Sequence, residues 1–183
     1  MTGMITMAYL LAAIMFILSL SGLSSQETAK RGNYYGIAGM ILAIGATIAS
    51  SSVQAYGLIA GAMAIGAVIG LILAQRVEMT SMPELVAMLH SFVGLAAVLI
   101  GWGGFIAPPA GLSGVEHVIH NTEIYLGIFI GAITFSGSLV AFAKLKGLVS
   151  GSPLTLPARH WLNAIAMLAS IVMLVIFARD SHA

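Results

Sequence analysis

The sequence predicts an all-α fold, a polytopic transmembrane bundle of about six helices with its N-terminus outside. Composition, the length of the apolar segments and the placement of basic residues lead to this prediction. Of the 183 residues, 60% are hydrophobic and 7% are charged, and the mean hydropathy is +1.05. Soluble domains carry about 25% charged residues, so this chain has too few charges to cover a water-exposed surface. We therefore expect it in a lipid bilayer.

Six apolar segments approach the roughly 20 residues that a helix needs to cross a bilayer. They are residues 5–23, 34–50, 56–74, 84–107, 123–143 and 160–178. Helix is predicted for each, because lipid leaves backbone groups unsatisfied in anything but helices and closed barrels, and no strand alternation is present. The second segment is the shortest, with Tyr34 and Tyr35 at its start suited to the membrane interface. Met1 leads into the first segment without a small-residue cleavage site, so we expect this helix to be retained.

The basic residues between the segments predict the orientation. They lie in the first, third and fifth connections: Lys30, Arg31, Arg76, Lys144, Lys146 and Arg159. The second and fourth connections contain neither Lys nor Arg, and Arg179 alone follows the sixth segment. By the positive-inside rule the odd connections face the cytoplasm. Six crossings then place both ends of the chain outside.

Several functional classes are disfavoured by composition. The formal net charge is +1, which offers no basic field for nucleic acid. The absence of cysteine excludes disulfides, thiolate metal sites and a cysteine nucleophile. Ligation of haem by two histidines is not favoured either, because only His90 of the five histidines lies deep in a predicted helix.

Four titratable residues precede or begin the fifth segment: Glu116, His117, His120 and Glu123. Two histidines three residues apart are compatible with metal ligation. However, Asn121 or Thr122 followed by Glu123 is typical of a helix start, with the acid in the first turn. We favour a helix cap beside an outer vestibule and expect no bound metal.

The fourth segment begins "MPELVAMLHSFVG", and two of its residues can titrate. Ser81 and Glu84 have the spacing of a capping box, with Pro83 tolerated in the first turn, so a structural role for Glu84 is open. His90 lies six residues further, about 9 Å along a helix. Since the half-thickness of the hydrocarbon is about 15 Å, His90 is expected well inside it.

His90 shares a helical face with Ala87, Gly94, Ala97 and Gly101. Faces of small residues pack against other helices in membranes, so we expect His90 to point into the bundle. Two interpretations remain open on chemistry alone. The imidazole is either a neutral core group bonded to a neighbouring hydroxyl or carbonyl, or a relay that binds and releases a proton near neutral pH.

Hydroxyls that would extend such a relay lie at Thr134, Ser136 and Ser138 of the fifth segment, and Ser91 is a further candidate. Each one alone is expected to bond to a carbonyl of its own helix, as Ser and Thr commonly do in membrane helices. Three hydroxyls within five residues, followed by Lys144, still make this the most polar segment after the fourth.

Several blocks of the chain resemble the β subunit of proton-translocating nicotinamide nucleotide transhydrogenase. They are "RVEMTSMPELVAMLHSFVGLAAVLIG", "RGNYYGIAGM", "EIYLGIFIGAITFSGSLVAFAKL" and "PARHWLN". They extend from the first connection into the sixth helix and include polar as well as apolar positions. By this resemblance the family's membrane histidine falls on His90, through "LHSFVG", and a serine of its fifth-helix motif falls on Ser138.

The resemblance implies a translocase that couples hydride transfer between NAD(H) and NADP(H) to proton movement. Soluble NAD(H)- and NADP(H)-binding domains would lie on the cytoplasmic side, and membrane helices of the α subunit would complete the proton-conducting bundle. The complex is expected to be a dimer of such units. This chain is expected to bind neither nucleotide.

The family's β subunit continues through more helices into an NADP(H)-binding domain, which this sequence does not include. We therefore expect the chain to be an N-terminal piece of the subunit that does not transfer hydride alone. The short N-terminus without a transit peptide favours a bacterial inner membrane.

We expect a proton to enter from outside near His120 and Glu123, to reach His90, and to leave past Glu84 toward the cytoplasm. Arg76 and Glu78 in the third connection are expected to couple His90 to the NADP(H) domain. Two alternatives stay open: a secondary transporter or channel subunit with no redox partner, and a structural subunit in which His90 is a satisfied core group.

Overall fold

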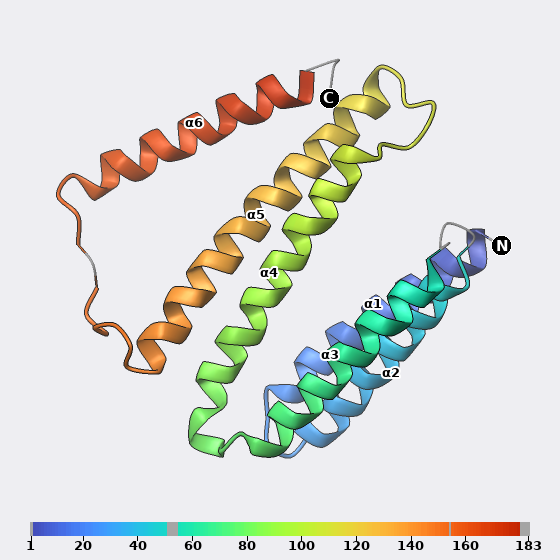
Figure 1. Ribbon diagram of the computed structural model, residues 1–183, viewed down its shortest axis with the longest axis vertical. Coiled ribbons are helices and arrows are strands. Elements are labelled where there is room, and N and C mark those ends of the chain that lie inside the picture. The colour runs from blue at the N-terminus through green and yellow to red at the C-terminus, as the bar shows by residue number, and fades with distance from the viewer. Residues whose placement is uncertain (1, 51–54, 154, 180–183) are drawn as a thin grey trace. The chain divides into compact units, whose positions relative to one another are not determined.

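The computed structural model describes residues 2–50, 55–153 and 155–179, and this part of the chain is all-helical (Figure 1). Its helices are α1 (Thr2–Leu23), α2 (Ala29–Ile48), α3 (Tyr56–Arg76), α4 (Met82–Ile106), α5 (Val115–Leu145) and α6 (Arg159–Arg179). A 3-10 turn, η1 (Met79–Ser81), precedes α4. The predicted all-α class is confirmed.

Five helices are long and apolar enough to cross a membrane, as judged over the described residues. These spans are Gly3–Leu23, Tyr56–Arg76, Met82–Ile106, Val115–Leu145 and Arg159–Arg179. The helix α2 is not among them. It begins at Ala29, five residues before the predicted start, and its first two turns include Lys30, Arg31 and Asn33. Five predicted crossings thus meet this criterion, and the crossing by α2 stays a prediction.

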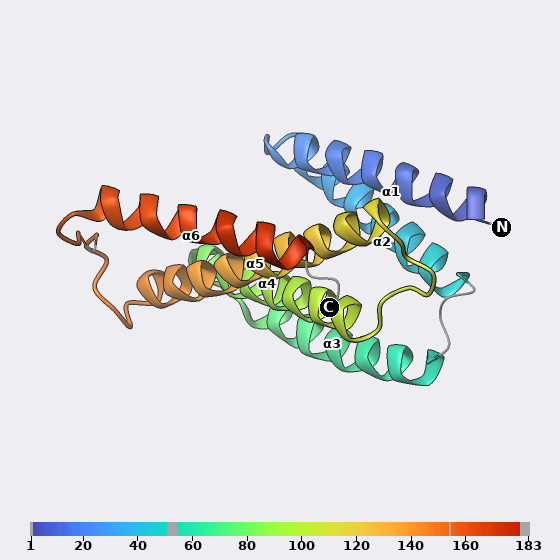
Figure 2. The same cartoon turned by 90° about the horizontal axis from the view of Figure 1, so that it is seen from above.

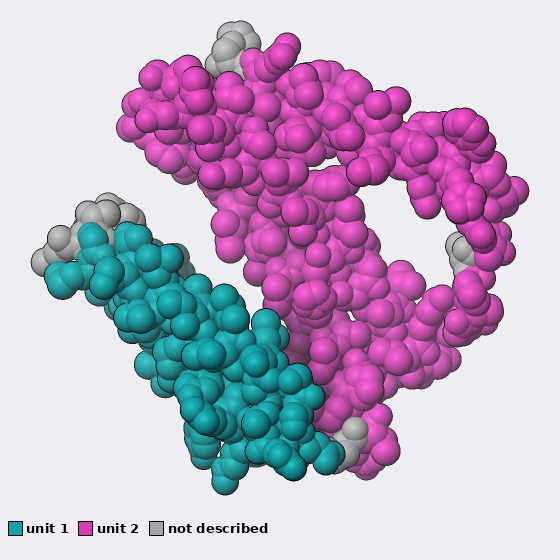
Figure 3. Space-filling model, turned by 180° about the vertical axis from the view of Figure 1, so that it is seen from behind, with its two compact units in different colours: residues 1–75 teal, residues 76–183 magenta. Residues whose placement is uncertain are grey.

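The chain divides into two compact units, residues 1–75 and 76–183 (Figure 3). In the first unit, α1 and α2 form an antiparallel hairpin (Figure 1). Its two helices touch backbone to backbone at Gly22 and Gly32, where a Cβ on Gly22 would lie 2.6 Å from the Gly32 Cα. At the other end Tyr9 Oη and Thr47 Oγ1 are 2.9 Å apart. No residue of α3 is buried within the described structure.

In the second unit, α4 and α5 lie side by side and antiparallel (Figures 1 and 2). Their closest approach is at Gly94 and Gly131, both buried. A Cβ on Gly94 would clash with the Phe135 backbone nitrogen and lie 2.7 Å from the Gly131 oxygen. A Cβ on Gly131 would lie 2.7 Å from the Gly94 oxygen. Such close contact between small residues is how membrane helices gain packing energy without a hydrophobic drive.

The helix α6 contacts the N-terminal half of α5 through polar and aromatic groups. The Tyr125 hydroxyl donates to the Ser170 carbonyl at 2.8 Å, and the Asn121 amide donates to the Phe177 carbonyl at 3.4 Å. The Phe177 ring lies 6.0 Å from that of Tyr125 and 5.8 Å from that of Phe105. Phe177 is in the last turn of α6, where carbonyls lack partners within the helix, so Asn121 satisfies one of them from a neighbouring helix.

One predicted capping bond is not formed, and one predicted helix start is wrong. Ser81 is the N-cap of α4 but its side chain makes no capping bond, because η1 holds it at φ −93° and ψ 2° rather than in the extended backbone of a capping residue. The fifth helix begins eight residues before its predicted start. Its N-cap is Gly114, at φ 52°, so Asn121 lies within the helix and is 2% exposed. Thr122 donates to the Val118 carbonyl at 2.7 Å instead of capping.

Replacing Gly94 by Ala is expected to destabilise the α4–α5 pair by about 1–3 kcal/mol, the usual cost of overpacking. The physical reason is the clash with Phe135 and Gly131 backbone atoms, which are not free to rotate away. Thermal unfolding of the intact subunit in detergent measures the loss. Gly103→Ala in the same helix is the control, since nothing lies within 4 Å of its added Cβ. Equal melting temperatures for the two variants would contradict the packing described above.

Candidate functional site

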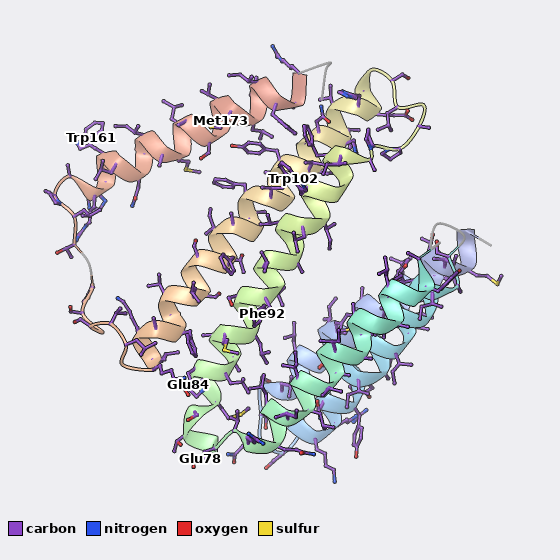
Figure 4. The ribbon with its side chains drawn as sticks, viewed as in Figure 1. Glu78, Glu84, Phe92, Trp102, Trp161 and Met173 are labelled. Carbon is purple, nitrogen blue, oxygen red and sulfur yellow. The ribbon has the colours of Figure 1, made fainter. Side chains whose placement is uncertain are left out.

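The candidate site residues on α4 and α5 lie within one helix pair. Glu84, in the first turn of α4, lies at one end of the pair, Phe92 lies near its middle, and Trp102 lies toward the other end (Figure 4). The antiparallel contact of Gly94 with Gly131 sets the register. Residues just before Gly94, including His90, therefore lie beside residues just after Gly131, where the α5 hydroxyls are found.

One flank of the α4–α5 pair contains a cavity of about 360 Å³, in the half of the pair nearest the loop that joins the two helices. Its walls are Ala97, Ile100, Gly101 and Gly104 of α4, and His120, Glu123, Ile124 and Gly127 of α5. The helix α6 contacts the N-terminal half of α5 on another side, through Tyr125. Tyr125 follows Glu123 by two residues, which is about 200° around the helix. We call the side with the cavity the open flank.

His90 lies on the open flank. It precedes the wall residue Ala97 by seven residues, which brings it to within about 20° of the same helical direction. Its imidazole is exposed and has no hydrogen bond to any residue that the structure describes. The prediction that His90 packs into the bundle is not met among these helices. The buried line of α4 runs through Ser91, Gly94 and Gly101, and His90 lies at its edge.

Thr134 and Ser138 lie on the same flank as His90. They follow the wall residue Gly127 by seven and eleven residues, each within about 20° of its direction. Both are half-buried, and neither hydroxyl has a hydrogen-bond partner within the described ranges. The expectation that each hydroxyl bonds to a carbonyl of its own helix is therefore not met for Thr134 and Ser138. Thr134 and Ser138 thus keep hydroxyls available to water or to a further helix.

Ser136 and Ser91 do bond to their own helices, as expected. The Ser136 hydroxyl donates to the Ala132 carbonyl at 2.8 Å from the exposed outer side of α5. The Ser91 hydroxyl donates to the Met88 carbonyl at 2.6 Å, and the residue is 3% exposed. The structure therefore separates the four candidate hydroxyls into two bonded and two available ones.

His120 and Glu123 lie between two neighbouring cavities and line both of them. A second cavity, of about 340 Å³, lies beside the α4–α5 loop and also includes Glu116. His120 Nε2 lies 3.4 Å from the Gly104 carbonyl oxygen. His117 instead lies 3.4 Å from the Asn121 amide nitrogen, through its Nδ1. Among the described residues, no three His, Asp or Glu side chains are placed to hold a metal ion.

The proposed coupling residues lie at and after the end of α3. Arg76 is the last residue of α3 and is exposed. Glu78 is exposed in the segment before η1, and Glu84 is half-buried in the first turn of α4 (Figure 4). No hydrogen bond or ion pair within the described chain involves any of these three side chains, so their charges remain available to other molecules.

Asn121 and Tyr125 are the structurally important polar residues that the sequence did not reveal. Both serve the α5–α6 contact. The available signal was an amide and a phenol four residues apart, on one face of what proves to be a single long helix. That signal was hidden because Asn121 was interpreted as a helix start.

Comparison with known proteins identifies the family of this chain. The family model described as NAD(P) transhydrogenase beta subunit matches residues 5–183. Two relatives, from Rhodospirillum rubrum and from a named strain of that species, are each called NAD(P) transhydrogenase subunit beta. Each is 49% identical to this chain over 164 residues, which is 87% of this chain and 35% of the relative. The chain belongs to the NAD(P) transhydrogenase beta subunit family and forms part of its membrane region.

Proposed function

We propose that this chain is the proton-conducting membrane part of a proton-translocating NAD(P) transhydrogenase, and that His90 binds and releases the transferred proton. The observation that supports this most directly is the alignment of His90, Ser138, Thr134, Glu123 and His120 on the open flank of one helix pair. Intramembrane ionisable groups commonly mark ion pathways. An imidazole is suited to the task, because it exchanges a proton near neutral pH.

The proposed path begins at the two cavities shared by His120 and Glu123. From Gly104, beside His120, to His90 is fourteen residues of α4, about 21 Å of helix. This is about two-thirds of a hydrocarbon core that is about 30 Å thick. The cavity of about 360 Å³ in this stretch has room for several waters at about 30 Å³ each. Water next to small residues would link the acidic entrance to the hydroxyls near His90.

Beyond His90 the path would continue toward Glu84, six residues and about 9 Å further along α4. Thr134 and Ser138 would accept a hydrogen bond from the protonated imidazole, which has two N–H donors, whereas the neutral ring has one donor and one acceptor. This difference is the contact by which proton binding would bias two states of the bundle. Ser91 and Ser136 would join the path only after releasing their backbone carbonyls.

Other parts of the complex would complete the function. Hydride transfer between NAD(H) and NADP(H) would occur in soluble domains of partner segments, and this chain would bind neither nucleotide. Membrane helices of an α subunit would cover the open flank, and two such units would form a dimer. Arg76 and Glu78 would contact the NADP(H)-binding domain. The proposed location is a bacterial inner membrane.

The role of His90 is tested in the intact complex, reconstituted in liposomes with a pH-sensitive dye inside. His90→Ala is expected to slow proton uptake linked to transhydrogenation by about 100-fold, the lower range for a group that transfers protons. Phe92→Ala is the matched control. Phe92 is also exposed on α4 but lies about 200° away around the helix. It should retain pumping.

His90→Asn separates a proton carrier from a merely satisfied polar group. The amide retains hydrogen bonding but does not titrate. Loss of pumping in His90→Asn, with a melting temperature equal to that of the unmodified complex, supports the carrier role. Normal pumping by this variant would show that His90 is structural.

The hydroxyls of α5 provide a second test on the same assay. Ser138→Ala is expected to lower coupled proton transfer by about tenfold, since losing one hydrogen bond of about 1–1.5 kcal/mol in the rate-limiting state has that effect. Ser136→Ala is its control, two residues away, because the Ser136 hydroxyl bonds to carbonyls of its own helix, those of Ala132 and Ile133. Equal rates for these two variants would remove the open flank from the proposed path.

A further inference from the structure

The turn between α1 and α2 holds a polar cavity that the proposed proton path does not use. It has a volume of about 220 Å³. Its polar walls come from Ser21, Thr28, Arg31 and Tyr35, and Gly22 and Gly32 line it as well. The first unit forms this cavity by itself, from the end of α1 and the start of α2.

Arg31 is fixed in place but retains binding capacity. Its Nε and Nη2 donate to the Tyr35 hydroxyl at 3.0 and 2.8 Å, and its guanidinium carbon lies 5.5 Å from the centre of the Tyr35 ring. A guanidinium has five N–H donors, so three remain after these two bonds. No carboxylate pairs with Arg31 anywhere in the described chain. A guanidinium group that is held in one orientation and has free N–H donors is suited to bind two oxygens of one anion.

The backbone of the turn creates the space beside Arg31. Gly22 and Gly32 touch without side chains, and the Thr28 hydroxyl closes the turn by donating to the Gly22 carbonyl at 2.6 Å. The Ser21 hydroxyl has no partner among the described residues and adds a free donor to the wall. At about 30 Å³ per water, a volume of about 220 Å³ accommodates a phosphate group with a few waters.

The position of the cavity indicates where such a phosphate would come from. The apolar span of α1 ends at Leu23, next to Ser21 and Gly22, so the cavity opens where acyl chains give way to headgroups. Leu18, one turn earlier, adds an apolar wall that is 45% exposed. Basic pockets at this depth bind anionic lipid headgroups. The turn's one acid, Glu27, does not line the cavity.

We infer that the cavity at the α1–α2 turn binds the phosphate of an anionic phospholipid, with Arg31 and Ser21 as donors and Leu18 against the first part of an acyl chain. The role of His90 does not enter this inference, because the two sites share no residue. A free phosphate ion has the same chemistry at Arg31, and the apolar wall at Leu18 is the feature that favours the lipid.

The test uses the intact complex in nanodiscs of phosphatidylcholine with a minor fraction of phosphatidylglycerol. Native mass spectrometry counts the phosphatidylglycerol molecules retained after release into detergent. We expect one retained lipid for each copy of this chain. Arg31→Gln should lower that occupancy by about tenfold or more, since charge-assisted hydrogen bonds are the strong ones. Lys30→Gln is the matched control, because it removes the same charge from a residue outside the cavity.

Tyr35→Phe provides a variant that retains every charge. It removes the phenol oxygen that orients Arg31, so it should reduce lipid occupancy, though by less than Arg31→Gln does. This variant keeps the inference testable if the Arg31→Gln complex is unstable. Wild-type retention in both Arg31→Gln and Tyr35→Phe would overturn the inference, as would equal losses in Arg31→Gln and Lys30→Gln. Binding of inorganic phosphate by the unmodified complex, with no phosphatidylglycerol retained, would overturn the lipid assignment.

Discussion

The contact between Gly94 and Gly131 determines where the other features of the second unit lie. Two helices whose backbones meet at these residues have one register, because any shift along the axis would bring a side chain into a space that admits only hydrogen. That register brings His90 beside the residues of α5 that follow Gly131, and Gly104 beside His120. The candidate proton groups are therefore arranged by a contact in which none of them takes part.

The two flanks of the α4–α5 pair have different chemistry. On one, Asn121 and Tyr125 donate to carbonyls of α6, and aromatic rings fill the space between the helices. On the other, hydroxyls and an imidazole have no bonds within the described chain. A polar group facing lipid would be costly, so this second flank is expected to face other protein or water.

The sequence predicted the helical class and the ends of most helices because hydropathy over twenty residues is a long and strong signal. It was wrong at α5, where Glu116, His117 and Asn121 lowered local hydropathy although the chain remains helical from Val115. Local polarity cannot distinguish a loop from the end of a long helix whose polar groups face a neighbour.

For the candidate site, the sequence placed the residues on the helices where the structure has them, but it did not distinguish the buried side of α4 from the exposed side where His90 lies. His90 and Gly94 lie four residues apart and were assigned one stripe, whereas only Gly94 is buried. The buried side of a helix is determined by the helix that packs against it. Here α5 packs against the side of α4 that contains Ser91 and Gly94, and His90 lies beside this contact. Likewise nothing local distinguished Ser138 from Ser136, since the difference depends on which side of α5 the cavity lies.

The early start of α2 has a consequence for the surrounding bilayer if α2 crosses it, as the sequence predicts. From Tyr34 to its end at Ile48, α2 offers fifteen residues, about 22 Å, against a hydrocarbon thickness of about 30 Å. A helix that is too short for its membrane draws the headgroups inward or extends basic side chains toward them. Lys30 and Arg31 lie in the turn of α2 just before this short apolar stretch. Their side chains have apolar stems that can lie in the hydrocarbon while the charged ends reach the headgroups. Bilayer thickness should therefore influence how deeply the α1–α2 hairpin sits in the membrane.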